Sequence, residues 1–142
     1  MSSDGAWRLA TSAVHLLHRA SQKADTIFVR TAGASLTPRQ FIILAAAVER
    51  PGINQIAIVE NTGIDKSTVA ELTQRLVKRG LLQRRRMRKD ARSYAVRPTS
   101  EGKDVLRKLL PAARDADKAV LAGTGPQLIE LLETLISAPG NR

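Results

Sequence analysis

A glycine turn between two short helical segments is the feature that most constrains this fold. Asn54 and Asp65 are residue types that cap helix N-termini, each precedes an apolar run with helical spacing, and Gly63 separates the two runs. If Gln55 is the first position of a helix-turn-helix unit, the apolar positions that two crossed helices need are occupied by Ile58, Ile64, Val69 and Leu72. This spacing predicts a helix-turn-helix.

The pattern changes after the second of these helices. Gly80 can end that helix in the left-handed conformation, and residues 81–87 and 93–97 then form two strand-like segments around a polar tip at residues 88–92. Thr99 is placed to cap another helix directly afterwards. A hairpin in this position predicts the wing of a winged helix-turn-helix.

Both ends of the chain carry further amphipathic helices. Side chains in the first segment recur at spacings of three and four, namely Trp7, Ala10, Val14, Leu17, Ser21, Ala24 and Phe28. Thr37-Pro38-Arg39-Gln40 reads as a capping box with proline in the first helical position, and Pro51-Gly52 ends that helix. The helical period returns over residues 105–120 and 128–136. These apolar stripes exceed what one winged unit can cover, which predicts a twofold dimer.

The predicted fold is therefore mainly α with a small β-hairpin wing (α+β). We expect a winged helix-turn-helix flanked by N- and C-terminal dimerisation helices. One domain should extend over residues 1–142, with the winged helix-turn-helix core at 36–98 and the dimerisation helices at 5–33 and 99–137.

Composition excludes several classes of protein. With 43% apolar residues the chain can bury a core unaided, and the absence of Cys excludes disulfides, thiolate catalysis and Cys-ligated zinc. The longest apolar run, residues 41–48, is too short to span a bilayer, so we expect a cytoplasmic protein with no membrane partner. We find no nucleophile–base set and no phosphate-binding glycine loop, so we expect no enzyme.

The positive charge is concentrated in one part of the chain. Residues 75–108 contain thirteen Lys or Arg and three acidic residues, so this segment alone accounts for the formal net charge of +10. A cationic strip directly after a helix-turn-helix indicates a protein that follows a phosphate backbone. The few aromatic residues, 3% of the chain, offer little for stacking single-stranded bases, which favours double-stranded DNA as the partner.

Two groups of polar side chains are candidates for contact with DNA. On the second helix of the predicted helix-turn-helix, they lie off the apolar face and are Lys66, Ser67, Thr68, Glu71, Gln74, Arg75 and Lys78. On the hairpin, they are Arg84, Arg85, Arg86, Arg88, Lys89, Asp90 and Arg92. The alternatives are an ordinary solvated helix face and a hairpin that aids solubility or attracts RNA or anionic lipid. The glycine turn and the basic hairpin together favour DNA.

Four short motifs follow one another along the chain. They are Leu36-Thr37-Pro38-Arg39-Gln40-Phe41, Gly63-Ile64-Asp65-Lys66-Ser67-Thr68-Val69, Arg75-Leu76-Val77-Lys78-Arg79-Gly80-Leu81 and Asp90-Ala91-Arg92. In this order they resemble the MarR family of winged-helix transcription regulators. The resemblance implies a homodimer joined through its terminal helices, with recognition helices in successive major grooves and wing tips in the flanking minor grooves.

The resemblance also implies regulation by a small molecule, often an aromatic or phenolic acid or a conjugate of one. The family places the pocket between the first helices and the winged core, where His15, His18 and Phe41 are the candidate residues. The alternative is that the two histidines pack in the core or at the dimer interface, and that Phe41 is a packing residue. Two His without Cys and without a clear third ligand make a poor metal site, so we expect no metal and no cofactor.

One candidate residue departs from the family pattern. Glu71 stands where relatives often carry Arg on the base-facing part of the recognition helix. A carboxylate cannot donate to guanine, but it can accept from cytosine N4, so we expect an operator sequence that differs from those of better-known relatives.

The sequence thus predicts a DNA-binding transcriptional regulator with sequence specificity. We expect a repressor that binds an inverted-repeat operator as a homodimer and is released by a small-molecule effector. An architectural or nonspecific nucleic-acid-binding protein without an effector is the alternative.

The hairpin tip generates a first prediction. If Asp90 orients the guanidinium of Arg92 in a narrow minor groove, Arg92→Ala should weaken specific binding by more than about 1 kcal/mol. Asp90→Ala keeps the positive charge and should also weaken binding, because the arginine is no longer oriented. Titration of a selected operator fragment with each variant measures both effects. Tighter binding by Asp90→Ala would mean that net charge alone matters.

Overall fold

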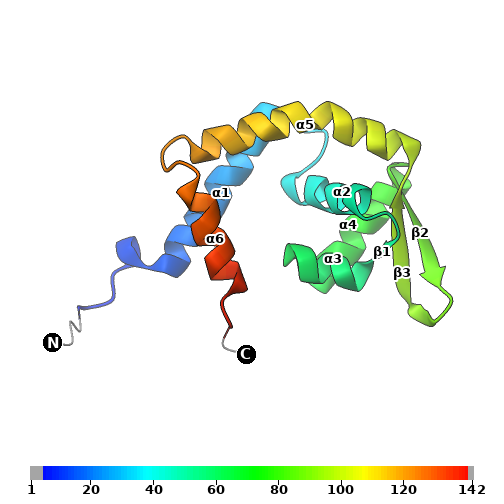
Figure 1. The fold of residues 1–142 in the computed structure, drawn as a ribbon, viewed down its shortest axis with the longest axis horizontal. Helices are drawn as coiled ribbons and strands as arrows, with labels where there is room; N and C mark the ends of the chain where they lie inside the picture. Colours follow the sequence, from blue (N-terminus) through cyan, green and yellow to red (C-terminus); the bar gives the residue numbers. More distant parts are fainter. Residues whose placement is uncertain (1–4, 141–142) are drawn as a thin grey trace.

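The computed structural model describes residues 5–140, apart from the side chains of residues 90–92. Within this range the elements follow one another as η1 (Leu9–Thr11), α1 (Ala13–Ala32), α2 (Pro38–Glu49), β1 (Ile53–Asn54), α3 (Gln55–Thr62), α4 (Lys66–Lys78), β2 (Leu82–Met87), β3 (Asp90–Pro98), α5 (Ser100–Leu121) and α6 (Gln127–Ser137). The strands form one antiparallel sheet in the order β1-β3-β2 (Figure 1). The predicted mainly α fold with a small hairpin wing is confirmed.

The helices of the winged unit begin at the predicted caps. Thr37 and Gln40 form the capping box, with each side chain accepting from the backbone N–H of the other at 3.1 and 3.2 Å. The side chain of Asn54 accepts from the N–H of Ala57 at 2.7 Å, and Gly63 ends α3 with a φ of 71°. These caps involve only residues close together in the sequence, so the starts of α2 and α3 and the end of α3 are set by local contacts.

Two predicted boundaries are wrong. The first long helix begins after Ser12 and not at Trp7, because the side chain of Ser12 accepts from the N–H of His15 and starts α1 there. The predicted five-residue hairpin tip is also too long, since β3 already begins at Asp90. A third strand, β1, in which Ile53 pairs with Val96 of β3, was not expected from the sequence.

The core lies between α2, α3, α4 and the sheet. Its buried apolar side chains are Leu36, Ile43, Leu44, Ala47, Ile53, Ile58, Val69, Leu76, Leu81, Leu82, Val96 and Leu106. The apolar run at residues 41–48 suggests a helix buried on every side, but Ile42 on the outer face of α2 is 42% exposed. The core therefore fixes the position of α4 from one side and leaves its other side free.

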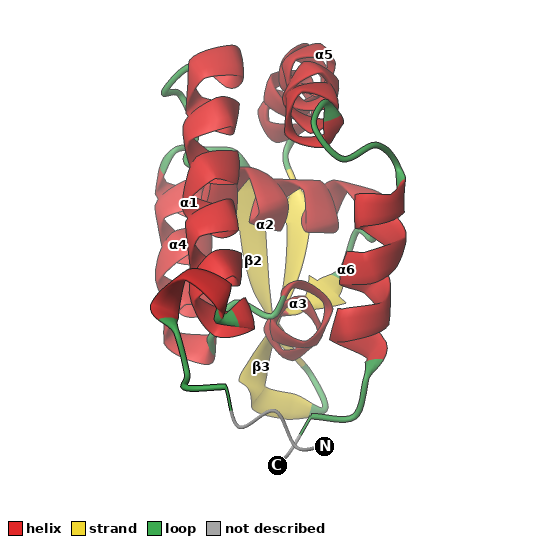
Figure 2. Cartoon of the chain, turned by 90° about the vertical axis from the view of Figure 1, so that its left-hand side faces the viewer, coloured by secondary structure: helices red, strands yellow, loops and turns green. Residues whose placement is uncertain are grey.

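The helix α5 connects this winged unit to the N-terminal part of the chain. It runs from the end of the sheet to the region where it packs against α1 (Figure 1). Its buried residues Leu106 and Ala116 lie on either side of Pro111, which has no N–H and cannot donate to the carbonyl of Arg107. In Figure 2, α1 stands on the left and α6 on the right, with α5 at the top between them. Among the described residues, no helix combines the length and apolar character that crossing a membrane requires.

The start of α5 makes direct contact with the backbone that leaves α4. The hydroxyl of Thr99 donates to the carbonyl of Gly80 at 2.6 Å and accepts from the N–H of Gly102 at 3.0 Å. The N–H of Thr99 donates to the carbonyl of Leu81. Gly102 lies so close to Leu81 that a Cβ on it would stand 2.0 Å from the Leu81 carbonyl oxygen.

This contact predicts the effect of two matched substitutions. Gly102→Ala should destabilise the fold by at least about 2 kcal/mol, because backbone on both sides must move to admit the methyl group. Gly123→Ala, with nothing within 4 Å of its Cβ, should change stability by less than about 1 kcal/mol. Urea denaturation of both variants measures the difference. If the two variants were equally stable, the contact between α5 and the Leu81 backbone would be able to widen at little cost in free energy.

Candidate nucleic-acid interface

The helix α4 presents the predicted polar residues on its free face. Val69, Thr73 and Leu76 are buried against the core. The predicted contact residues Lys66, Ser67, Glu71, Gln74, Arg75 and Lys78 are all exposed, and Thr68 is half-buried. A helix with one buried stripe and a polar opposite face is the geometry that major-groove recognition requires.

The N-terminus of α4 is held by a carboxylate. One oxygen of Asp65 accepts from the N–H of Thr68 at 2.9 Å, and the other accepts from the Thr68 hydroxyl at 2.6 Å. These bonds from Thr68 lower the pKa of Asp65 below its ordinary value of 3.8. The hydroxyl of Thr68, a predicted DNA contact, therefore donates its hydrogen bond to Asp65 and not outward from the helix.

Glu71 is paired within its own helix. Its carboxylate accepts from the guanidinium of Arg75, one turn further on, at 2.7 Å. Both side chains are more than half exposed, at 60% and 62%, so the pair contributes little to stability. It does place two predicted DNA-contacting groups side by side, with the planar cation oriented by the anion.

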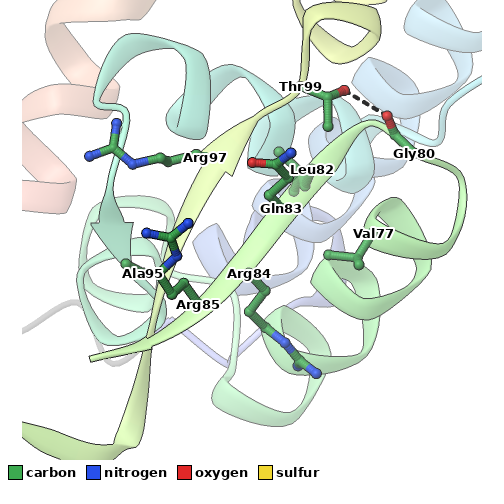
Figure 3. A pocket seen from close by; sticks show the side chains of 9 residues that line it. All are labelled: Val77, Gly80, Leu82, Gln83, Arg84, Arg85, Ala95, Arg97 and Thr99. Atoms are coloured by element: carbon green, nitrogen blue, oxygen red, sulfur yellow. Dashed lines mark hydrogen bonds between the residues drawn. The ribbon is translucent and has the colours of Figure 1, made fainter. Parts of the chain in front are cut away.

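Strand geometry divides the three consecutive hairpin arginines between two faces. Arg84 pairs with Val96 and Arg86 with Tyr94, whereas Arg85 between them pairs with Ala95. Because side chains alternate along a strand, Arg84 and Arg86 share the face that carries the core, and Arg85 points to the other side. Arg84, Arg85 and Arg97 all line a hollow of about 730 Å³. Figure 3 shows the Arg84 side chain directed away from those of Arg85 and Arg97.

Tyr94 is the residue of this site that sequence reasoning missed. The guanidinium carbon of Arg84 lies 4.4 Å from its ring centroid, and that of Arg86 lies 5.7 Å away. The Nε–H of Arg86 donates to the tyrosine hydroxyl at 3.2 Å. Consecutive arginines on a strand must alternate between its two faces. The residue opposite each of them depends on the register of the hairpin, which the predicted strand boundaries did not determine.

The tip of the hairpin is described only in part. Arg88 and Lys89 form the turn and are exposed, as expected for groups that reach DNA. The side chains of Asp90 and Arg92 lie outside the described residues, so their predicted pairing stays a prediction.

The residues predicted for an effector pocket are not brought together in one cavity. Phe41 packs against Phe28 of α1 with ring centroids 5.0 Å apart, and it lines a cavity of about 250 Å³ between α2 and the end of α3. His15 and His18 lie on α1, half-buried and exposed respectively, and do not line this cavity. Within the described residues, no three His, Asp or Glu side chains are grouped to hold a metal ion.

The helix α4 is packed on the core along one face and polar on the other, and a basic hairpin follows it. This arrangement defines a class of protein, the winged helix-turn-helix regulators of transcription. The profile of the MarR family matches residues 36–94. Over 101 residues, which make up 71% of this chain and 75% of the relative, the sequence is 33% identical to the transcriptional regulator HosA of Escherichia coli. The chain belongs to the MarR family, whose members are transcriptional regulators, as its four motifs indicated.

Two solved structures share the fold over almost the whole chain. The PcaV transcriptional regulator of Streptomyces coelicolor, in complex with its natural ligand, is 33% identical with a TM-score of 0.82, and the match covers 92% of this chain and 93% of PcaV. BpsR of Bordetella bronchiseptica, whose DNA binding is regulated by 6-hydroxynicotinic acid, is 28% identical with a TM-score of 0.85 over 94% of this chain and 100% of BpsR.

The cap of α4 generates a prediction about pH. Because the pKa of Asp65 is lowered in the folded protein, its charge stabilises the fold above the ordinary pKa of 3.8 and ceases to do so as the pH falls through the lowered value. Asp65→Ala should therefore lower the melting temperature at neutral pH. The deficit should shrink when both proteins are compared below that pKa. Thermal unfolding followed by circular dichroism checks this, and a deficit that does not change with pH would contradict it.

Proposed function

We propose that this chain is a homodimeric repressor that binds an inverted-repeat operator and is released by a small molecule. The observation that carries the proposal is that α4, buried on one face and polar on the other, packs directly against the arginine-bearing strand β2. Both elements are anchored in one buried core, so the polar face of α4 and the arginines of β2 can engage adjacent parts of one duplex.

Surface apolar residues support the dimer. Neither α1 nor α6 has a buried residue, and several of their large apolar side chains are widely exposed, among them Val14 (69%), Leu131 (68%) and Ile136 (80%). Trp7, ahead of α1, is 75% exposed. Burial of such side chains is favourable by about 25 cal/mol per Å² of apolar surface, and a second copy of the chain offers the matching stripe.

Twofold symmetry then determines the form of the operator. Two copies of α4 related by a twofold axis would read an inverted repeat whose half-site centres are about one helical turn, ~10 base pairs, apart. The resemblance to PcaV and BpsR supports the effector, because one was solved with its natural ligand and the other responds to 6-hydroxynicotinic acid. We infer a hydroxylated aromatic acid as the effector class.

We propose that the effector pocket forms between α1, which carries His15 and His18 near its N-terminus, and the face of α2 with Phe41, which packs against Phe28 further along α1. The cavity beside Phe41 is small in one chain, and the helices of a second copy would enclose it further. An effector there would change the spacing of the two recognition helices, with a coupling of ~1 to 3 kcal/mol.

The test combines selection and ligand screening. The full chain is used to select fragments of genomic DNA, and the selected sites are tested for a dyad while sedimentation at micromolar concentration gives the oligomeric state. A panel of aromatic acids that includes 6-hydroxynicotinic acid is then screened by thermal shift and by release from the selected site. A dimer, a dyad and a releasing ligand support the proposal. A monomer, sites without symmetry, or binding that no acid alters would favour the architectural alternative.

The Glu71–Arg75 pair generates a further prediction. Glu71→Gln should change the preferred base within each half-site by ~1 to 3 kcal/mol, both because the carboxylate acceptor is removed and because Arg75 is freed to donate elsewhere. Selection from a randomised operator library measures the change. Glu60→Gln on α3, also exposed, removes the same charge and should leave the preference unaltered. An unchanged motif for Glu71→Gln would show that this side chain faces solvent in the complex.

A further inference from the structure

One aromatic ring organises two of the hairpin arginines. Tyr94 of β3 is directly opposite Arg86 of β2, and Arg84 lies two residues back along β2 on the same face. The guanidinium of Arg84 stacks over the ring, and that of Arg86 reaches its hydroxyl by a hydrogen bond of 3.2 Å. Stacking and hydrogen bonding at one ring restrict two side chains that would otherwise be free in solvent.

The ring itself has a fixed place in the fold. Its neighbours along β3 include Ser93, which is 7% exposed, and Val96, which is fully buried. Tyr94 also lines a cavity of about 430 Å³ with Lys66 and Ala70 of α4 and with residues of α3. Tyr94 therefore stands where the hairpin meets the N-terminal end of the recognition helix.

The charges around the ring act on its hydroxyl. The hydrogen bond from Arg86, followed by the charge of Arg86 and then that of Arg84, lowers the pKa of Tyr94 below its ordinary value. The pKa of this tyrosine therefore reports whether the two arginines are near its hydroxyl. Its titration can be followed directly, because the sequence contains one tyrosine.

We propose that Tyr94 is a positioning residue that holds Arg84 and Arg86 as a pair for contact with operator phosphates. Arg85, on the opposite face, is outside this pair. An arginine that is already oriented loses less conformational entropy on binding than a mobile one. The ring of Tyr94 therefore raises the affinity for DNA without contacting DNA itself. This inference rests on the proposed function, since the phosphates are those of the operator.

The first experiment uses the free protein. The near-ultraviolet absorbance of tyrosinate is followed as a function of pH in the wild type, in Arg86→Ala and in Arg85→Ala. Arg86→Ala should raise the pKa of the tyrosine clearly, and Arg85→Ala, which removes an equal charge from the neighbouring position, should alter it much less. Equal shifts in the two variants would overturn the proposal, because they would show a general charge effect and no specific pair.

The second experiment measures DNA affinity as a function of salt concentration. Arg84→Ala and Arg86→Ala should each lower the magnitude of the slope of log K against log salt, by ~0.9 for every operator phosphate that the missing arginine would have neutralised. Tyr94→Leu, with both arginines retained, should weaken binding roughly tenfold, and Tyr94→Phe, which keeps the stacked ring, roughly threefold. In the background of Arg84→Ala and Arg86→Ala together, Tyr94→Leu should have almost no further effect.

The outcomes separate this inference from the function on which it rests. Full affinity in Tyr94→Leu, or a decrease that simply adds to that of the arginine variants, overturns the positioning role while leaving the operator intact. A wild-type protein that binds no DNA in a salt-dependent and sequence-selective way contradicts the proposed function instead. If Tyr94→Leu does not fold, Tyr94→Phe decides: full affinity combined with an unchanged salt slope overturns the proposal.

Discussion

The contact between Gly102 and the backbone of Leu81 is the constraint on which the arrangement of the molecule depends. The space there admits no Cβ, and Thr99 closes the same junction by bonding to Gly80 and to Gly102. The end of the recognition helix, the first hairpin strand and the start of α5 thus meet at one junction, where Gly102 touches the backbone of Leu81 and the Thr99 hydroxyl bridges Gly80 and Gly102. The orientation of α4 is thereby tied to that of the helix that reaches α1, which is the connection a ligand-responsive regulator needs.

Local chemistry explains why much of the fold could be predicted. The caps at Thr37, Asn54, Asp65 and Thr99 each bind an N–H three residues away, so their partners are visible in the sequence itself. The two-residue strand β1 could not be predicted in this way, because Ile53 and Asn54 pair with residues more than forty positions later. The start of α1 was missed for a different reason: an apolar stripe continued past Ser12, while the cap there determined where the helix begins.

In the candidate site too, the features set by local sequence could be predicted and those set by tertiary contacts could not. Periodicity relative to Val69 and Leu76 correctly predicted the exposed residues of α4 except Thr68, which is half-buried. The four-residue spacing of Glu71 and Arg75 already permitted their ion pair. The contact of Arg84 and Arg86 with Tyr94 depends on cross-strand register, which is set by the turn geometry together with the hydrophobic pattern, and the register shifts between Arg86 and Met87. Arg79, which donates to the carbonyl of Ser35 at 2.8 Å, likewise depends on tertiary packing.

Pro111 makes α5 easier to bend at this residue than an uninterrupted helix of the same length. About 15 Å of helix follows this residue before Leu121, and one backbone hydrogen bond is missing at the proline. A bend of only about 10° there would displace the far end of the helix by about 3 Å, a distance comparable to the thickness of an aromatic ring. The junction at Gly102 would remain undisturbed, so the two ends of the molecule could change their relative position without any repacking of the winged core.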